Sequence, residues 1–360
     1  MKKEMQFASI DGNKVVWALP DGSLNTPRFD EYGGVGLQDV LKATVWDILG
    51  YDPGKEKRFP KIVGAEDWIS CIVDRPQNIP RSLTRGAYDI GITGEDLELE
   101  FGSGNIELVD LEGGRVRLIA AVRKDLPGSI DEYFKFMHSR GRKVVVYTEY
   151  VARALDTVVT NEAYMRLWGD KRPKMRLEGY GMTVGENPDV EIVRSAGKTE
   201  DGIPLGYLVI DNMQTGSTLG EVGGHVITDP PILTSTARLY AGRHVLENPE
   251  KVNNVERIAR ELDAVVTARK HRYVVFNVRK DDLKAVIDYL QDENLFADEP
   301  TIIPGQRYAQ VAVYIPKDGA DTIATEIRGL GGRSEVVSQP TQVYDLGEEP
   351  RPYKLALRRD

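Results

Sequence analysis

Cysteine and histidine are scarce in this chain of 360 residues. The single cysteine, Cys71, excludes an intrachain disulfide and a cysteine-built metal cluster, and its apolar neighbours predict a buried, inert thiol. Four histidines occur, and no two of them have the close spacing of a metal motif such as H-E-x-x-H. The sequence therefore argues against a zinc site built from histidine or cysteine.

Positive charge is also in deficit, since 47 Lys and Arg face 56 Asp and Glu, for a net charge of −9. This balance argues against a protein that binds the phosphate backbone of nucleic acid. No apolar run reaches the roughly 18 residues that a membrane span needs. Residues 1–7 are charged, with no apolar stretch behind them. We therefore expect a cytoplasmic protein with no nucleic-acid or membrane partner.

The stretch 207–219, YLVIDNMQTGSTL, carries the clearest chemical pattern. A strand is expected at 207–210, Asp211 ends it, and Thr215 to Thr218 form a small hydroxyl-rich turn around Gly216. The glycine lets backbone N–H groups approach an anion, and the carboxylate of Asp211 can hold a ribose hydroxyl or hydrated Mg²⁺. No lysine follows the glycine, so this is not a Walker P-loop. The motif indicates a phosphate cradle, with a plain surface loop as the alternative.

Three further turns follow expected strands and repeat this logic. Residues 20–23 follow a strand at 14–19, Thr93-Gly94 stands in DIGITGED, and residues 195–200, with Gly197, follow a strand at 190–193. Separately, Arg75 follows an expected strand at 69–73. A guanidinium at a strand end suits an oxyanion, and an exposed Arg paired with a nearby carboxylate is the alternative. If the fold brings these turns together with 211–219, a phosphate-binding cleft results.

The remaining pattern predicts alternating strands and helices in two or three domains. Helices are expected at 37–49, 79–85, 151–167, 232–240 and 253–270, and the strand at 115–122 is interpreted as a crossover into a second lobe. The polar, glycine-rich segment 25–36 is either a lid over a site or a surface insertion without a function of its own. Residues 273–337 follow the order β-α-β-β-α-β, which is typical of a ferredoxin-like unit.

An ordered series of short motifs accompanies these elements. They are ALP-x-G at 18–22, RP-x-x-IP at 75–80, D-x-GITG-x-D at 89–96, G-x-x-E at 197–200, D-x-x-x-TG-x-TL at 211–219, S-x-A-R at 235–238, ARK and a strand at 268–277, and Pro300-Thr301. Each motif is weak alone, and the series is specific. By it, the chain resembles the long form of ATP phosphoribosyltransferase, the first enzyme of histidine biosynthesis.

The resemblance implies an α/β fold with a two-lobed catalytic region like a type II periplasmic binding protein. Lobe I would comprise 1–115 and 233–270, and lobe II would comprise 116–232. A C-terminal ferredoxin-like βαββαβ domain at 271–347 would be regulatory, bind histidine as an inhibitor and precede a tail at 348–360. The resemblance further implies a homo-oligomer, a hexamer.

The reaction implied by the resemblance is attack of adenine N1 of ATP on C1 of phosphoribosyl pyrophosphate, with Mg²⁺ and loss of pyrophosphate. Residues that match the family's sugar-phosphate motif are Asp211, Gln214, Thr215, Gly216, Ser217 and Thr218. Those that would line the remaining cleft, toward ATP, are Asp21, Gly22, Arg75, Gly94 and Glu200. Thr301 would contact histidine, and no catalytic residue or metal ligand is assigned.

Four positions depart from the family pattern. Asp21 and Ser23 stand where Lys and Arg are common, Asn78 where Asp is common, and Gln214 where Glu is frequent. Loss of two cations weakens polyanion binding by roughly a few kcal/mol unless other cations such as Arg28, Arg81 or Lys198 compensate. The sequence therefore leaves two alternatives to an ATP phosphoribosyltransferase. One is a related phosphoribosyltransferase with a different acceptor, and the other is a non-catalytic, ligand-sensing homologue.

Overall fold

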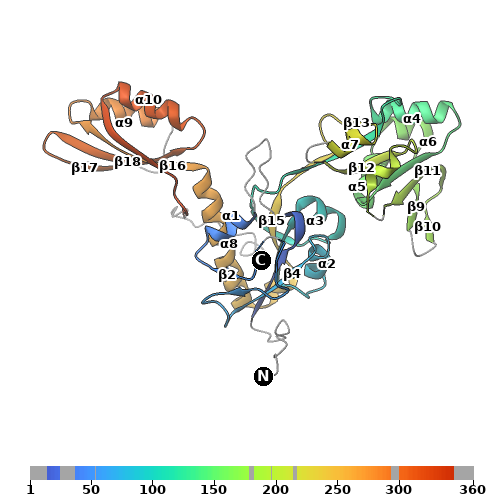
Figure 1. The fold of residues 1–360 in the computed structure, drawn as a ribbon, viewed down its shortest axis with the longest axis horizontal. Helices are drawn as coiled ribbons and strands as arrows, with labels where there is room; N and C mark the ends of the chain where they lie inside the picture. The colour runs from blue at the N-terminus through green and yellow to red at the C-terminus, as the bar shows by residue number, and fades with distance from the viewer. Residues whose placement is uncertain are drawn as a thin grey trace.

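The computed structural model describes residues 14–24, 37–52, 54–177, 182–195, 197–213, 217–292 and 300–343. Three units, each built on its own sheet, follow one another across the molecule in Figure 1. We call them lobe I, lobe II and the C-terminal unit. The expected fold class is confirmed, because two α/β lobes connected by crossing strands are followed by a βαββαβ unit.

Lobe I is built on a five-stranded sheet of order β4-β1-β5-β15-β6. Its strands are β1 (Val15–Pro20), β4 (Ile69–Asp74), β5 (Ile90–Gly94), β6 (Ile106–Asp110) and β15 (Ala237–Ala241). β1 runs parallel to β4 and β5, whereas β15 is antiparallel to β5 and β6. The carboxyl ends of β4, β1 and β5 therefore meet at one edge of the sheet, where α/β proteins place ligand groups.

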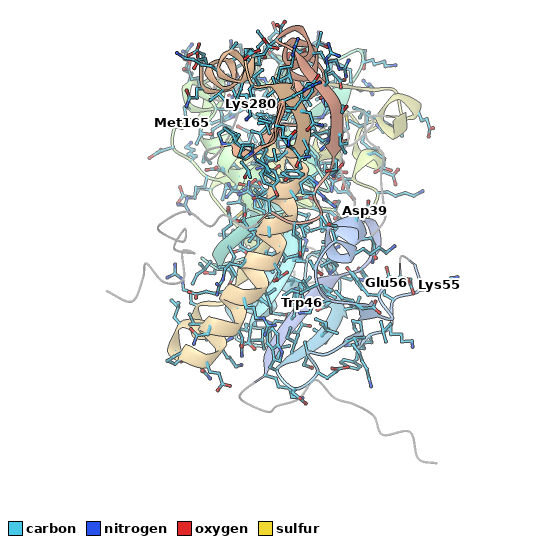
Figure 2. All side chains as sticks on the ribbon, turned by 90° about the vertical axis from the view of Figure 1, so that its left-hand side faces the viewer. Asp39, Trp46, Lys55, Glu56, Met165 and Lys280 are labelled. Carbon is cyan, nitrogen blue, oxygen red and sulfur yellow. The ribbon has the colours of Figure 1, made fainter. Side chains whose placement is uncertain are left out.

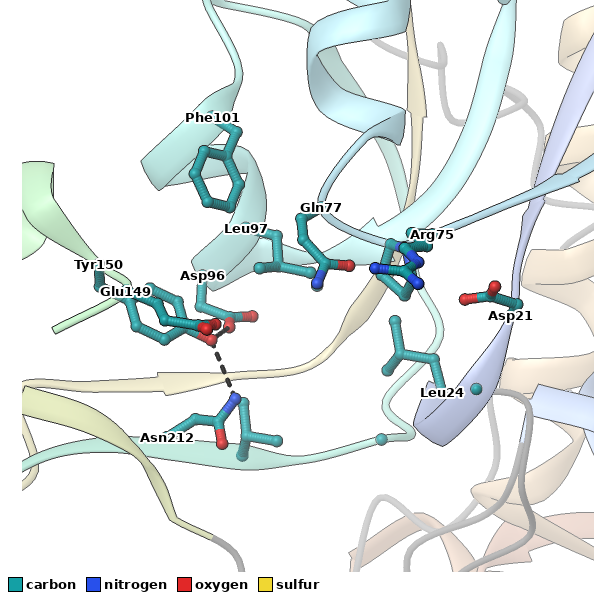
Figure 3. Close-up of a pocket in the computed structure, with 15 residues that line it drawn as sticks. Asp21, Leu24, Arg75, Gln77, Asp96, Leu97, Phe101, Glu149, Tyr150 and Asn212 are labelled. Atoms are coloured by element: carbon teal, nitrogen blue, oxygen red, sulfur yellow. Dashed lines mark hydrogen bonds between the residues drawn. The ribbon is translucent and has the colours of Figure 1, made fainter. Parts of the chain in front are cut away.

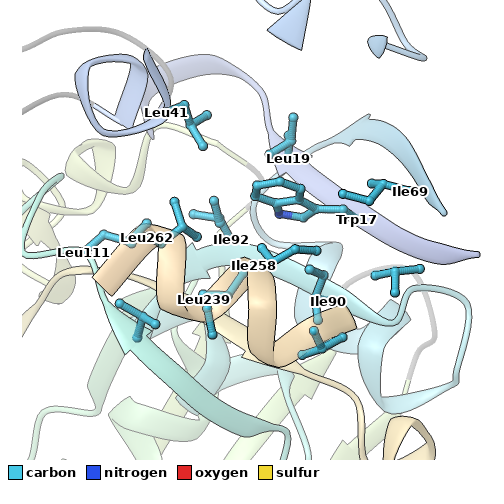
Figure 4. Close-up of a cluster of buried hydrophobic side chains, with 14 of the residues drawn as sticks. Trp17, Leu19, Leu41, Ile69, Ile90, Ile92, Leu111, Leu239, Ile258 and Leu262 are labelled. Carbon is cyan, nitrogen blue, oxygen red and sulfur yellow. The ribbon is translucent and has the colours of Figure 1, made fainter. Parts of the chain in front are cut away.

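Helices cover both faces of this sheet. On one face, α1 (Leu37–Lys42) and α8 (Pro249–Arg269) pack over a core with Trp17, Leu239 and Ile258 (Figure 4). On the other face, Ile79 and Leu83 of α2 (Ile79–Thr84) are fully buried. Next to α2 lies α3 (Glu95–Phe101), which follows β5 without a linker. The end of β5 and the start of α3 thus stand at the edge where ligand groups are expected.

Lobe II is built on a sheet of order β10-β9-β11-β8-β12-β7-β13, with β14 paired to β7. Its strands are β7 (Val116–Arg123), β8 (Val144–Thr148), β9 (Pro173–Leu177), β10 (Met182–Val184), β11 (Asn187–Arg194), β12 (Leu208–Met213), β13 (Gly224–Val226) and β14 (Leu233–Ser235). β8 lies between β11 and β12 and is parallel to both, so the ends of these three strands also meet.

The helices of lobe II are α4 (Ile130–Ser139), α5 (Val151–Val159), α6 (Glu162–Trp168) and α7 (Ser217–Glu221). Phe134, Tyr164 and Trp168 meet in T-shaped and tilted ring contacts in the core, with ring centroids 5.3 to 6.0 Å apart. Such contacts between α4 and α6 fix the outer layer of lobe II.

Two segments cross between the lobes side by side. The first leaves β6 for β7, and the second leaves β14 for β15. Backbone hydrogen bonds join them, from Leu111 N to Ala237 O at 2.9 Å and from Ala237 N to Gly113 O at 2.8 Å. Gly114 has φ of +62°, a conformation that favours glycine. The interpretation of 115–122 as a crossover into a second lobe is confirmed.

The C-terminal unit has sheet order β17-β18-β16-β19. Its elements are β16 (His271–Arg279), α9 (Leu283–Asp292), β17 (Thr301–Pro304), β18 (Tyr308–Pro316), α10 (Ala320–Gly329) and β19 (Gly332–Ser338). Helix α8 runs from lobe I to this unit and passes directly into β16 (Figure 2). The predicted element order is confirmed. Thr301 opens the edge strand β17 with an exposed side chain.

Two predicted helices are wrong. Residues 232–240 form the end of a loop and strands β14 and β15, because β15 gains backbone hydrogen bonds from β5 and β6 on both of its edges. The helix expected at 37–49 ends at Lys42, where the Thr44 hydroxyl bonds the Leu41 carbonyl, and Ile48–Leu49 form β2, paired with β3 (Lys61–Ile62). Hydroxyl bonds to the backbone compete in this way with helix continuation.

Two further boundaries differ from the prediction. The helix expected at 151–167 is broken at Asn161, whose side chain accepts a hydrogen bond from Tyr164 N and caps α6. The strand expected to end at Asp211 continues to Met213, because β12 stays paired with β7 from Val209 to Met213. The loop 25–36 and the tail 348–360 lie outside the described residues. Among the residues described, no helix is long and apolar enough to cross a membrane.

A candidate active site between the lobes

A cavity of about 300 Å³ lies between the two lobes (Figure 3). Its lining comes from the strand ends of lobe I, from α3, from the crossing segment and from lobe II. The residues are Asp21, Gly22, Leu24, Arg75, Pro76, Gln77, Gly94, Asp96, Leu97, Phe101, Gly114, Val116, Glu149, Tyr150 and Asn212. A ligand in this cavity contacts both lobes at once.

The lobe I wall follows from the parallel register of its sheet. Asp21 and Gly22 follow β1, Arg75 follows β4, and Gly94 ends β5. Gly22 has φ of +67°, and a Cβ on Gly94 would lie 2.3 Å from Oδ1 of Asp96, so both positions suit glycine. These four predicted cleft residues all line the cavity.

The lobe II wall is tied to lobe I by a buried hydrogen-bond network. The Tyr150 hydroxyl donates to Oδ2 of Asp96 at 2.8 Å, and Nδ2 of Asn212 donates to the Tyr150 oxygen at 3.0 Å (Figure 3). Oγ of Ser235 donates to Oδ1 of Asp96 at 2.6 Å. Asp96 is 4% exposed, so it depends on these donors for its stability.

A second contact between the lobes lies one helical turn away on α3. The Glu100 carboxylate accepts backbone N–H groups of Ala152 and Arg153 at 2.9 to 3.1 Å, at the first turn of α5. A carboxylate at a helix N-terminus satisfies free donors and opposes the positive end of the helix dipole. Burial raises the pKa of Glu100, and these hydrogen bonds and Arg153 act in the opposite direction.

Three carboxylates gather at the strand ends of lobe II. Glu149 follows β8, Asp211 lies in β12, and Glu200 lies in the 3₁₀ turn η2 (Thr199–Gly202). Burial raises the pKa of Asp211 to about 6, and the charges of Glu149 and Glu200 add to the rise. Hydrogen bonds from Asn212 N–H and the Thr199 hydroxyl lower it in part. This part of the site is rich in negative charge.

At the strand ends of lobe I, one acid, Asp21, and one cation, Arg75, line the cavity. Burial raises the pKa of Asp21, the nearby Arg75 guanidinium lowers it, and Glu56 and Asp74 raise it further. Among the described residues that line the cavity, Arg75 is the one cation beside the carboxylates of Asp21, Asp96 and Glu149. A ligand with several negative charges would therefore need positive charge from groups outside this lining.

The donor set fits Mg²⁺ carried by a substrate. In the described part of the chain, no group of three or more His, Cys, Asp or Glu is arranged to hold a metal ion. Enzymes that act on phosphate-bearing substrates commonly bind Mg²⁺ through one or two carboxylates together with substrate phosphates and water. Glu149 and Asp211 offer such hard oxygen ligands beside the cavity.

The other predicted site residues either do not line the cavity or lie outside the described residues. Glu200 lies close enough to Asp211 to raise the pKa of Asp211, and neither residue is among those lining the cavity. Gln214, Thr215 and Gly216 lie outside the described residues, and α7 begins at Ser217 with Thr218 as its second residue. Thr301 lies in the C-terminal unit and takes no part in this cavity.

Eleven of the 15 lining residues were not predicted as site residues, and among them are the polar residues Asp96, Glu149, Tyr150 and Asn212. Asp96 belongs to DIGITGED, and Asn212 directly follows Asp211. Glu149 and Tyr150 follow β8 without a glycine, so the strand-end rule did not single them out. The usable signal was their position after a parallel strand.

Comparison with known proteins identifies a family for this chain. A family model described as "HisG: ATP phosphoribosyltransferase" matches residues 75–264. An ATP phosphoribosyltransferase of Ignicoccus hospitalis is 30% identical over 228 residues, 62% of this chain and 66% of that protein. One of Methanosarcina acetivorans is 24% identical over 324 residues, 89% of this chain and 96% of that protein.

A solved structure, the ATP phosphoribosyl transferase (HisG:HisZ) complex from Thermotoga maritima, aligns with a TM-score of 0.45 at 18% identity. The alignment covers 70% of this chain and 98% of the other. The family model spans more than half of the 360 residues. The chain therefore belongs to the ATP phosphoribosyltransferase family.

Proposed function

We propose that this enzyme joins its two substrates in the cavity between lobes I and II. The reaction is transfer of the phosphoribosyl group of phosphoribosyl pyrophosphate to N1 of ATP, with release of pyrophosphate, the first step of histidine biosynthesis. The observation that supports this location is the meeting of Asp21, Gly22, Arg75 and Gly94 with Glu149 and Tyr150 around one cavity.

The residues act mainly by alignment. Adenine N1 must lie in line with C1 of the sugar and with the leaving pyrophosphate, and holding two reactants in this way removes most of the entropic barrier. We assign the 5-phosphate and ribose to Asp211 and to residues 214–218, which follow β12 in the sequence. Arg75 would bind phosphate oxygens, because its planar fork matches two of them.

We assign Mg²⁺ to the carboxylate-rich side of the cleft, with Glu149 or Asp211 as its protein ligands. When bound, the ion neutralises charge on the leaving pyrophosphate. Chelation of Mg²⁺ is expected to abolish turnover. We also propose that the C-terminal unit binds histidine as an inhibitor, with Thr301 among the contacts, that the chain assembles as a hexamer, and that it works in the cytoplasm.

The test is turnover of ATP with phosphoribosyl pyrophosphate and Mg²⁺, followed by absorbance of the adduct, with and without histidine. Product that requires Mg²⁺ supports the activity, and suppression by histidine supports the regulatory role of the C-terminal unit. The matched variants are Arg75→Ala, expected to lose at least tenfold in kcat/KM, and Arg140→Ala at the end of α4 in lobe II, expected to lose nothing.

Asp21 supports a second candidate, a related enzyme with a different acceptor. It places a carboxylate in the first turn beside Arg75, where a cation is common in the family. Calorimetric binding of phosphoribosyl pyrophosphate without adduct formation from ATP would exclude the first proposal and direct the search to other purine acceptors.

A further inference from the structure

The ring of Phe101 contacts two arginine guanidinium groups, one from each lobe. It ends α3 in lobe I and lines the cavity. The Arg81 guanidinium, from α2, lies 4.5 Å from its ring centroid, and the Arg194 guanidinium, from the end of β11 in lobe II, lies 5.7 Å from it. Both distances fall within the range of a cation–π interaction, which orders a guanidinium without using its N–H donors.

Both arginines keep their donors available. Their side chains are exposed, and among the described residues neither takes part in an ion pair with a carboxylate. By contrast, Arg238 of lobe I is bound by Glu95 and Glu107. Two ordered and unpaired guanidinium groups at the edge of a site are suited to bind an anion with several oxygens.

The position of this pair complements Arg75. In Figure 3, Phe101 lies at the far side of the cavity from Arg75 and Asp21, with Asp96 and Leu97 between them. The reaction brings two polyphosphate groups into one cleft, the triphosphate of ATP and the pyrophosphate of the sugar substrate. Like charges of this size cannot share one cation without strong repulsion, so the second group needs positive charge elsewhere.

We infer that Arg81 and Arg194, held against Phe101, bind the polyphosphate group of one substrate. This inference rests on the proposed function and adds a specificity site to it. Because the two arginines come from opposite lobes, an anion between them also draws lobe II toward lobe I. The site supplies cations from α2 and β11, where the first turn with Asp21 and Ser23 lacks them.

The experiment compares Arg81→Ala, Arg194→Ala and Phe101→Leu with Arg140→Ala. Arg140 is a matched control, since its guanidinium lies 4.3 Å from the ring centroid of Phe136 on the surface of lobe II. We expect each site variant to raise the KM of one substrate about tenfold with little change in the KM of the other. The double variant Arg81→Ala with Arg194→Ala is expected to add to this effect.

The substrate whose KM rises identifies the polyphosphate. A rise for ATP assigns its triphosphate to the pair, and a rise for phosphoribosyl pyrophosphate assigns the pyrophosphate. Equal KM values in the site variants and in Arg140→Ala would overturn the inference. Calorimetry with inorganic tripolyphosphate and pyrophosphate tests the site even without turnover: binding at least tenfold weaker in the double variant supports it, and unchanged binding overturns it. Failure of adduct formation in the wild type counts only against the proposed function.

Discussion

The hydroxyl of Tyr150 in lobe II donates a hydrogen bond of 2.8 Å to the Asp96 carboxylate in lobe I. Both side chains are buried, and both line the cavity. The same bond therefore holds the lobes together and forms part of the wall of the site.

Tyr150→Phe removes this donor while keeping the ring. Asp96 then retains the hydrogen bond from the Ser235 hydroxyl of β14 and loses the one from Tyr150 at the start of α5, which costs about 1–3 kcal/mol for a buried group. We expect kcat/KM to fall about tenfold in steady-state kinetics, because the lobes close less firmly. Tyr133→Phe is the control: its hydroxyl donates to the Gly206 carbonyl at 3.0 Å within lobe II. Equal activity in both variants would contradict a role for Tyr150 in closure.

Glu100→Gln tests the contact between α3 and α5. The amide replaces a charged cap on Ala152 N and Arg153 N by a neutral one, which weakens it by about 1 kcal/mol. We expect a larger radius of gyration in small-angle scattering of the ligand-free enzyme and a higher KM for both substrates. Glu162→Gln, an exposed acid paired with Arg166 on α6, is the control and should leave both quantities unchanged.

Asp211→Asn is expected to stabilise the protein and to reduce its activity. The folded pKa of Asp211, raised from 3.8 to about 6, means that the native state holds the proton more tightly than the unfolded chain. At pH 8 the buried carboxylate is therefore unfavourable, and the variant should gain roughly 2 kcal/mol in free energy of unfolding. This gain should vanish as the pH falls from 6 to below 4. Urea unfolding at several pH values measures it.

The wild-type activity should in turn decline as the pH falls through about 6, because protonated Asp211 no longer binds a cation or accepts from a ribose hydroxyl. An activity profile that is flat between pH 5 and pH 8 would contradict this assignment of Asp211.

Asp89→Asn is expected to destabilise lobe I. The buried Asp89 carboxylate accepts hydrogen bonds from Lys251 Nζ at 2.9 Å and from Val16 N at 2.8 Å, and Nε2 of His244 lies 3.0 Å from it. Burial acts to raise its pKa, and these partners outweigh burial, so the folded pKa is lowered. We expect a loss of about 3 kcal/mol at pH 7 in urea unfolding.

The direction in which the free energy of unfolding changes with pH tests whether the charged form of Asp89 is the source of this stability. A carboxylate with a lowered folded pKa contributes its full stability above its usual pKa and loses it as the pH falls through the folded value. The difference between wild type and Asp89→Asn should therefore shrink below about pH 4. Lys251→Met, which removes one partner and keeps the stem, should show the same trend with a smaller loss.

The lobe I wall of the cavity could be predicted because its strands are short apolar runs, each followed by a turn that contains glycine or proline. Asp21, Arg75 and Gly94 follow such runs, and parallel pairing of β4, β1 and β5 then brings them together. The C-terminal unit was predictable for a similar reason, since its elements alternate over short distances in the sequence.

The rest depends on contacts that local patterns do not contain. The apolar residues around Arg238 have a spacing that fits a helix as well as a strand. They form a strand because they pair with β5 and β6, which lie more than 100 residues earlier in the sequence. Tyr150 and Asp96 are 54 positions apart. Their meeting follows from how the lobes close, and no local spacing encodes it.

The place of β15 in its sheet sets the order in which the chain can be assembled during synthesis. β15 lies between β5 and β6, although it follows all of lobe II in the sequence. As the polypeptide leaves the ribosome, lobe I lacks an interior strand until residue 241 has emerged, whereas lobe II is continuous from β7 to β14. Lobe II can thus complete its sheet first, and the catalytic cleft is the last part of the pair to be built.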